Sequence, residues 1–154
     1  MAKHKEPQIK VRANALIELH DLQGRLLKSQ RRRNLVVNGG LQLIRDLIGG
    51  LRKWPTDMAV GTGTLAVAAT QTALDEQVYQ DLITRRVQQT YGIKYQLFIP
   101  AVAPGANDEA LTEAALLTVL GATTTMFARV TFDPFAKNSG NTLTVTWTVT
   151  VAAN

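Results

Sequence analysis

The stretch LTVTWTVTV, residues 143–151, decides the fold class of this protein. Apolar side chains alternate with threonines along its whole length. The apolar residues are Leu143, Val145, Trp147, Val149 and Val151. Period two places the apolar set on one face of a β-strand and the threonines on the other. The whole chain holds 18 Thr and 2 Ser, and this excess also favours strands, because a β-branched side chain suits a pleated sheet whereas serine favours caps and turns.

The N-terminal third predicts a hairpin followed by a helix. Residues 9–19 alternate like a half-buried strand, residues 21–24 have turn chemistry, and a basic second strand runs through residues 26–37. After a Gly-Gly break, apolar residues between 41 and 51 recur at helical spacing. We expect an amphipathic helix of about three turns there, with Asn38 as its N-cap.

The remainder predicts more strands and several loops. Strands are expected at residues 58–60, from about residue 82, over 91–99 and over 127–132. The connections between them are a glycine-rich bend at 61–64 and loops at 66–74 and 100–108. A hairpin connection is expected at 137–141. Residues 111–120 fit either a helix capped by Asn107 or Asp108 or a buried strand. Together these patterns predict a mainly β protein, an antiparallel β-sandwich with one short helix in the N-terminal third. The sandwich is expected over residues 34–154, and an extended basic N-terminal arm and hairpin over residues 1–33 precede it.

Charge is distributed unevenly along the 154 residues, whose formal net charge is +5. Residues 1–53 carry 12 Lys or Arg and 4 Asp or Glu, so +8, and residues 54–154 carry 5 against 8, so −3. This asymmetry suits head-to-tail contacts between like subunits or an acidic partner surface. Nucleic acid is the alternative partner, but no aromatic residue is interleaved with the arginine run, as single-strand binders usually require. The candidate interface residues are Arg25, Lys28, Arg31, Arg32, Arg33 and Trp54.

No catalytic, cofactor-binding or metal-ligating constellation is expected. The chain lacks cysteine, its histidines are His4 and His20, and neither Ser29 nor Ser139 lies in a nucleophile motif. Gly61-Thr62-Gly63 lacks the further residues of a phosphate-binding loop, so we interpret it as a bend. The carboxylates at residues 75, 76, 108, 109 and 113 are interpreted as solvated loop charges. Neither a secretory signal nor an apolar run long enough for a membrane span is present, so no membrane partner is expected.

Several motifs occur in a familiar order. They are residues 34–41 (NLVVNGGL), 58–64 (MAVGTGT), 69–76 (ATQTALDE), 111–115 (LTEAA), 126–132 (MFARVTF) and 143–149 (LTVTWTV). Together they resemble a group of small structural proteins of tailed bacteriophages, and the C-terminal half is similar to collar-like domains at the base of tail fibres. One departure is Ala115, where the family often has glycine.

The resemblance implies a non-enzymatic virion component, made in the host cytoplasm, that packs against copies of itself and against other virion proteins. It also favours a strand over a helix for residues 111–120. We expect a location in the tail, neck or fibre-attachment region; the alternatives are a capsid decoration (cement) protein and a nucleic-acid-binding module that uses Arg31 to Arg33. Copies of itself and other virion proteins are the expected partners, and no small-molecule substrate is expected.

Overall fold

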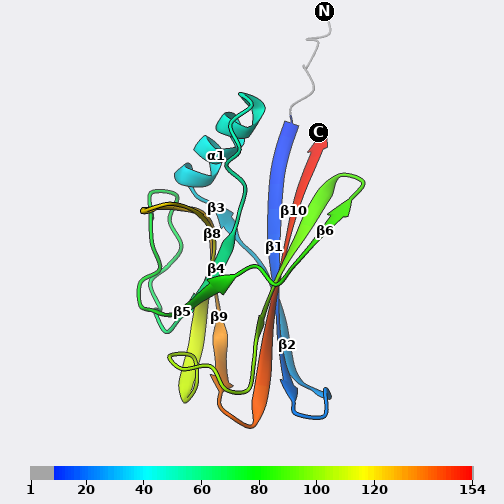
Figure 1. Ribbon diagram of the computed structural model, residues 1–154, viewed down its shortest axis with the longest axis vertical. Coiled ribbons are helices and arrows are strands. Elements are labelled where there is room, and N and C mark those ends of the chain that lie inside the picture. Colours follow the sequence, from blue (N-terminus) through cyan, green and yellow to red (C-terminus); the bar gives the residue numbers. More distant parts are fainter. Residues whose placement is uncertain (1–8, 154) are drawn as a thin grey trace, which may run out of the picture.

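The computed structural model describes residues 9–153, which form two five-stranded antiparallel sheets and one helix (Figure 1). In order across sheet A lie β2 (Leu26–Arg33), β1 (Ile9–Asp21), β10 (Asn141–Ala153), β7 (Gly92–Ile99) and β6 (Arg85–Gln89). In order across sheet B lie β3 (Leu35–Val36), β9 (Thr123–Lys137), β8 (Glu109–Leu120), β4 (Asp57–Gly61) and β5 (Gln77–Leu82). The helix is α1 (Asn38–Ile48). The prediction of a mainly β sandwich with one short helix is therefore confirmed.

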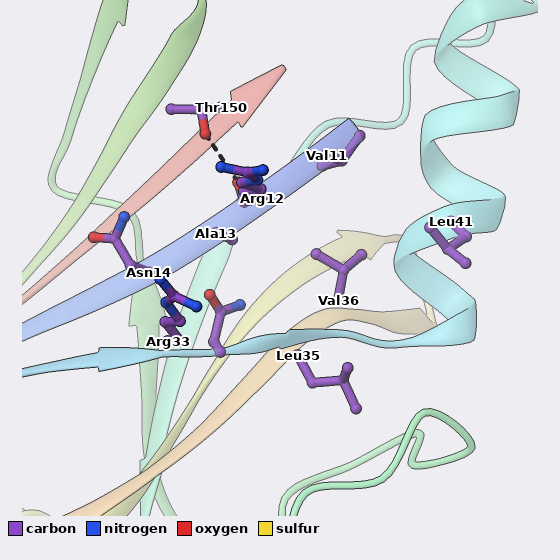
Figure 2. Close-up of a pocket in the computed structure, with 10 residues that line it drawn as sticks. Val11, Arg12, Ala13, Asn14, Arg33, Leu35, Val36, Leu41 and Thr150 are labelled. Atoms are coloured by element: carbon purple, nitrogen blue, oxygen red, sulfur yellow. Dashed lines mark hydrogen bonds between the residues drawn. The ribbon is translucent and has the colours of Figure 1, made fainter. Parts of the chain in front are cut away.

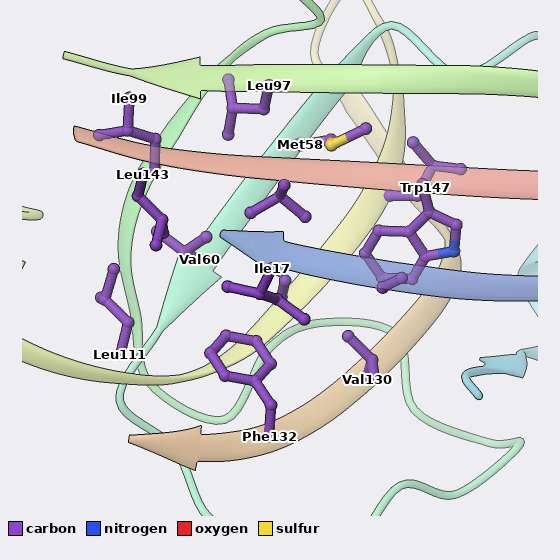
Figure 3. Close-up of a cluster of buried hydrophobic side chains, with 14 of the residues drawn as sticks. Ile17, Met58, Val60, Leu97, Ile99, Leu111, Val130, Phe132, Leu143 and Trp147 are labelled. Carbon is purple, nitrogen blue, oxygen red and sulfur yellow. The ribbon is translucent and has the colours of Figure 1, made fainter. Parts of the chain in front are cut away.

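The core lies between the two sheets and follows from the alternation in β10. Leu143, Val145 and Trp147 are fully buried, and the threonines between them face away from the core. Figure 3 shows Trp147 of sheet A pointing into the same space as Val130 and Phe132 of sheet B. The stretch that predicted the fold class thus supplies the middle strand of one sheet and the largest side chain of the core.

Residues 9–33, expected to form an arm and hairpin beside the sandwich, are two strands of sheet A. β1 pairs with β10 in continuous register from Ile9 opposite Ala153 to Asp21 opposite Asn141, and its Ala15 and Ile17 are fully buried in the common core. β1 is therefore an interior strand of sheet A. The expected boundary at residue 33 marks the point where the chain leaves sheet A after β2 and enters sheet B as β3. Residues 1–8 of the expected arm lie outside the described residues.

Residues 111–120 form a strand, and the helix alternative is wrong. The segment belongs to β8, whose side chains are buried on both faces: Leu111, Ala114 and Leu116 face the core, while Ala115 and Leu117 lie beneath a loop and the start of α1. Because burial on both faces removes the polar alternation of a half-exposed strand, periodicity could not identify it.

Two local predictions in the first two thirds also need correction. The strand expected from about residue 82 is β6, which begins at Arg85, and β5, which ends at Leu82 in the other sheet, was not expected. The helix is present, but its N-cap is Val37, which makes no side-chain capping bond, rather than Asn38. Close packing sets this helix start, because a Cβ added to Gly40 would lie 2.1 Å from the carbonyl oxygen of Phe127 on β9.

The outer faces of the two sheets differ. Sheet B is covered by the loop of residues 62–76 and by the start of α1, which bury a second apolar cluster of Val37, Ala59, Leu74, Ala115, Leu117 and Met126. Sheet A presents the half-buried threonines of β10, with no covering segment among residues 9–153. Over the same described residues, no helix has the length and apolar character needed to cross a bilayer.

Candidate interaction surfaces

Five of the six predicted interface residues lie on one side of the sandwich, here called the basic edge and defined as residues 22–36. This segment comprises the β1–β2 turn, β2 and β3, and it carries five Lys or Arg and no Asp or Glu. β2 is the last strand of sheet A on this side, and β3 is the last strand of sheet B. The cations are Arg25, Lys28, Arg31, Arg32 and Arg33.

The inward side of β2 is held against the end of β9. Lys28 Nζ donates to the carbonyl oxygen of Pro134 at 2.7 Å and lies 4.6 Å from the centre of the Phe135 ring. Two residues along, Gln30 exchanges two hydrogen bonds with Asp133. Arg32 Nη2 also reaches Asp133, at 3.1 Å. These contacts join β2 of sheet A to β9 of sheet B through side chains.

The outward side of β2 carries arginines that form no ion pair within residues 9–153. Arg31 lies opposite Leu16 and Arg33 opposite Asn14 in the register with β1. Both side chains are exposed, and neither makes a hydrogen bond or ion pair with another residue of the described range 9–153. Strand alternation therefore divides the run of three arginines, with Arg32 tied to the protein and its two neighbours directed outward.

Arg25 is largely used to close the β1–β2 turn. Its backbone N–H donates to Asp21 Oδ1 at 2.8 Å, and its Nε donates to Asp21 Oδ2 at 2.6 Å. The backbone bond from Arg25, reinforced by its side chain, lowers the pKa of the Asp21 carboxyl below its usual value. The turn predicted from Asp21 and Gly24 is thus confirmed, with Gly24 at a φ of +80°.

Trp54 lies apart from the basic edge. It is 41% exposed and belongs to the segment that joins α1 to β4. The next residue, Pro55, accepts a hydrogen bond at its carbonyl oxygen from Arg86 of β6, and Thr56 N–H donates to Leu117 of β8. Since β6 is the strand of sheet A farthest from β2, the structure does not bring Trp54 together with the five cations.

A second charged surface, missed by the sequence reasoning, lies on the other side of sheet B. Residues 54–84 contain four Asp or Glu and no Lys or Arg, and we call this segment the acidic edge. It includes β5, the last strand of sheet B on this side. Asp75, Glu76 and Asp81 are exposed there, and Asp57 is buried. Averaging the charge over residues 54–154 concealed this cation-free run, although it was visible in the sequence.

The cations that follow the acidic edge belong to sheet A. Arg86 is turned inward, where its Nη2 donates to the Pro55 carbonyl oxygen at 2.9 Å and its guanidinium lies 5.5 Å from the centre of the Tyr95 ring. Arg85 is on the outer face of β6, opposite Gln96. The exposed carboxylates of β5 and the preceding loop therefore remain the dominant charges of the sheet B margin.

A buried ion pair fastens the loop of residues 62–76 to sheet B, so the prediction that Glu113 is a solvated loop charge is wrong. Glu113 and Arg129 are both fully buried on neighbouring strands, with Arg129 Nε donating to Glu113 Oε2 at 2.9 Å. The carboxylate also accepts the backbone N–H groups of Gly63, Asp75 and Glu76. Arg129 Nη1 donates to Gln71 Oε1 at 2.8 Å. One charged pair thus provides hydrogen-bond partners for polar groups at both ends and in the middle of the loop.

The glycines of the predicted bend are required by this network. A Cβ added to Gly61 or Gly63 would lie 2.6 or 2.5 Å from Glu113 Oε1. The close approach of the backbone to a carboxylate, rather than to a phosphate, therefore explains the Gly-Thr-Gly pattern. Two signals pointed to the pair: a single Glu within the apolar run 111–120, and a single Arg within the apolar run 126–132.

A cavity of about 660 Å³ opens beside the basic edge, where the chain crosses from β2 to β3 (Figure 2). Its walls are apolar on the side of Val11, Leu35 and Leu41 and polar on the side of Arg12 and Arg33. Asn34 also lines it, and both polar atoms of the Asn34 side chain are buried without a hydrogen-bond partner among the described residues. A buried amide without partners is costly to the fold.

Residues considered for catalysis or metal binding do not come together in residues 9–153. His20 lies on β1 opposite Thr142, Ser29 lies on β2, and Ser139 lies in the β9–β10 turn. Within the described range no group of three His, Asp or Glu side chains is placed to hold a metal ion. His4 lies outside that range.

Comparison with protein-family models, with curated proteins and with solved structures finds no match for this chain.

Proposed function

We propose that this protein is a non-enzymatic structural subunit of a tailed-bacteriophage virion, which assembles through protein–protein contacts in the tail, neck or fibre-attachment region. It is made in the host cytoplasm and becomes part of the particle. The phage assignment is supported by the order of the short motifs between residues 34 and 149. The assembly role is supported by a separate observation, the charged edges on opposite sides of one sandwich.

Exposed apolar side chains add support for an assembly role. Ile48 at the end of α1 is 83% exposed and Leu82 at the end of β5 is 67% exposed. Leucines of the β1–β2 hairpin, Leu22, Leu26 and Leu27, are also more than half exposed. Apolar groups distributed around a small domain in this way suit burial against several neighbours in an assembly.

A capsid decoration protein is the second candidate, and the basic edge favours it. Its segment, residues 22–36, contains five cations, and Arg31 and Arg33 are exposed without a carboxylate partner among residues 9–153, which suits the exterior of an acidic shell. The nucleic-acid alternative has weaker support, because Arg32 is turned toward Asp133 and only Arg31 and Arg33 of the run are directed outward.

Particles that lack this protein provide the test. We expect electron microscopy of such particles to show a defective tail, neck or fibre attachment on an intact capsid, and quantitative mass spectrometry of wild-type virions to give a few to a few dozen copies. Hundreds of copies together with lost capsid protrusions would identify a decoration protein and overturn the tail assignment. Absence of the protein from purified virions would overturn the structural role altogether.

A further inference from the structure

We infer that this protein associates with further copies of itself head to tail, with the basic edge of one copy against the acidic edge of the next. The inference deepens the proposed assembly role and rests on it, since it names the partner and the two surfaces. It also makes a statement about the isolated protein that can be tested without virions.

Charge complementarity is the first argument. The basic edge, residues 22–36, has five cations and no carboxylate, and the acidic edge, residues 54–84, has four carboxylates and no cation. Arg31 and Arg33 are exposed on the first, and Asp75, Glu76 and Asp81 are exposed on the second. Charges of one sign attract the opposite edge and repel the same edge of another copy, so they specify both partner and orientation.

The positions of the two edges supply the second argument. β2 and β3 end the two sheets on one side, and β5 ends sheet B on the other side. A molecule with complementary surfaces on opposite sides cannot satisfy both in a twofold dimer. It forms a heterologous contact, which repeats as a closed ring or an open filament.

Exposed apolar side chains at both edges provide hydrophobic surface that such a contact would bury. Leu35 and Leu41 lie at the cavity beside the basic edge and are both exposed, and Leu65 and Leu82 are exposed on the acidic edge. Burial of these exposed leucines in such a contact is favourable.

Side chains, rather than a continued sheet, make this contact. The loop of residues 100–108 already approaches the backbone of β5, since a Cβ added to Gly105 would lie 2.5 Å from the carbonyl oxygen of Val78. This approach obstructs strand addition along β5. The association should therefore be governed by charge and respond strongly to salt.

Charge reversal tests the two edges separately. One variant combines Arg31→Glu with Arg33→Glu, and a second combines Glu76→Lys with Asp81→Lys. By sedimentation velocity at low salt, we expect the wild-type protein to form oligomers that dissociate as salt is raised, and each variant to associate at least about tenfold more weakly. Lys10→Glu combined with Lys94→Glu has the same charge change as the first variant on exposed positions of β1 and β7, and should still associate.

Mixing the two reversed variants is the decisive arm. The first variant replaces the two outward cations of the basic edge with carboxylates, and the second replaces two of the three exposed carboxylates of the acidic edge with lysines. The two altered edges are complementary to each other, so an equimolar mixture should form alternating oligomers that neither variant forms alone. Melting curves and circular dichroism of each variant establish that both are folded. If a reversed variant is not folded, the single substitutions Arg31→Glu and Asp81→Lys take its place.

Three results overturn the inference: a wild-type protein that is monomeric at low salt, reversed variants that associate like wild type, or a mixture that does not recover association. None of them affects the proposed function, because incorporation into virions is measured separately. Conversely, oligomers that form as inferred from a protein absent from virions would leave the contact standing and remove the phage role.

Discussion

The outer faces of the two sheets differ in what covers them. The outer face of sheet B is closed by the loop of residues 62–76, which is held by one buried ion pair and lies over a second apolar cluster. The outer face of sheet A carries a row of threonines and the outward arginines of β2, with no covering segment among residues 9–153. One charged pair is therefore used to hold the fold, while Arg31 and Arg33 of β2 and Asp81 of β5 remain exposed to other molecules.

The largest loss of stability should occur when the buried ion pair between Glu113 and Arg129 beneath the covered face of sheet B is broken. Arg129→Met leaves the Glu113 carboxylate buried without its cation, and we expect the free energy of unfolding to fall by about 3–5 kcal/mol. Urea denaturation followed by circular dichroism measures this change. The double variant Glu113→Gln with Arg129→Met should recover part of the loss, since it removes the uncompensated charge, and a double variant no more stable than the single one would contradict this explanation.

Gly63→Ala should have the next largest effect, because the added methyl group would lie 2.3 Å from Asp75 Cβ and 2.5 Å from Glu113 Oε1. We expect a loss of about 1–3 kcal/mol in the free energy of unfolding. Gly49→Ala is a matched control, with φ of −74° and no atom nearer than 3.4 Å to the added Cβ. Equal effects of the two substitutions on the melting temperature would show that the loop is not held as described.

A threonine on the outer face of sheet A should matter less. Thr148→Ala on β10 removes a half-buried side chain that no other segment of residues 9–153 covers, and we expect a loss of less than about 1 kcal/mol. Ala115→Thr provides the comparison on sheet B, where an added hydroxyl and methyl group would have to fit under the loop. A greater loss for Thr148→Ala than for Ala115→Thr in thermal denaturation would reverse the proposed difference between the faces.

The smallest effect on stability is expected at the basic edge. Arg31→Ala should change the free energy of unfolding by less than about 0.5 kcal/mol, because the side chain is exposed and makes no hydrogen bond or ion pair within residues 9–153. The same substitution should weaken self-association. A large loss of stability in urea, with association unchanged, would place Arg31 in the fold rather than in the contact.

Strands with one polar face could be predicted from the sequence, because their apolar and polar residues alternate. The threonines of β10 mark its outer face, and the alternation of β1 and β7 is of the same kind, so these strands and the sandwich could be predicted. β8 could not be assigned from its pattern, because a strand buried on both faces shows no alternation. The role of β1 as an interior strand was hidden as well, since β1 pairs with the far end of the chain.

Half of the candidate interaction site could be predicted from the sequence. The cations between residues 25 and 33 were predicted to be interface residues, but their division between two faces of β2 depends on strand register. The acidic edge was missed because the charge was summed over residues 54–154, which conceals that residues 54–84 contain no Lys or Arg. Trp54 was predicted to be an interface anchor because it is an aromatic residue next to Pro55, and the chain places it near β6.

Directed cross-linking between copies tests the central claim most directly. The chain has no cysteine, so Ser29→Cys on β2 and Gln77→Cys on β5 each introduce a single thiol without altering the charge of either edge. With a short bismaleimide, we predict that a mixture of the two variants gives a cross-linked dimer containing one copy of each, and that neither variant alone gives one. Cross-linking of Ser29→Cys to itself, or no product in the mixture at concentrations where the protein associates, would contradict the head-to-tail contact.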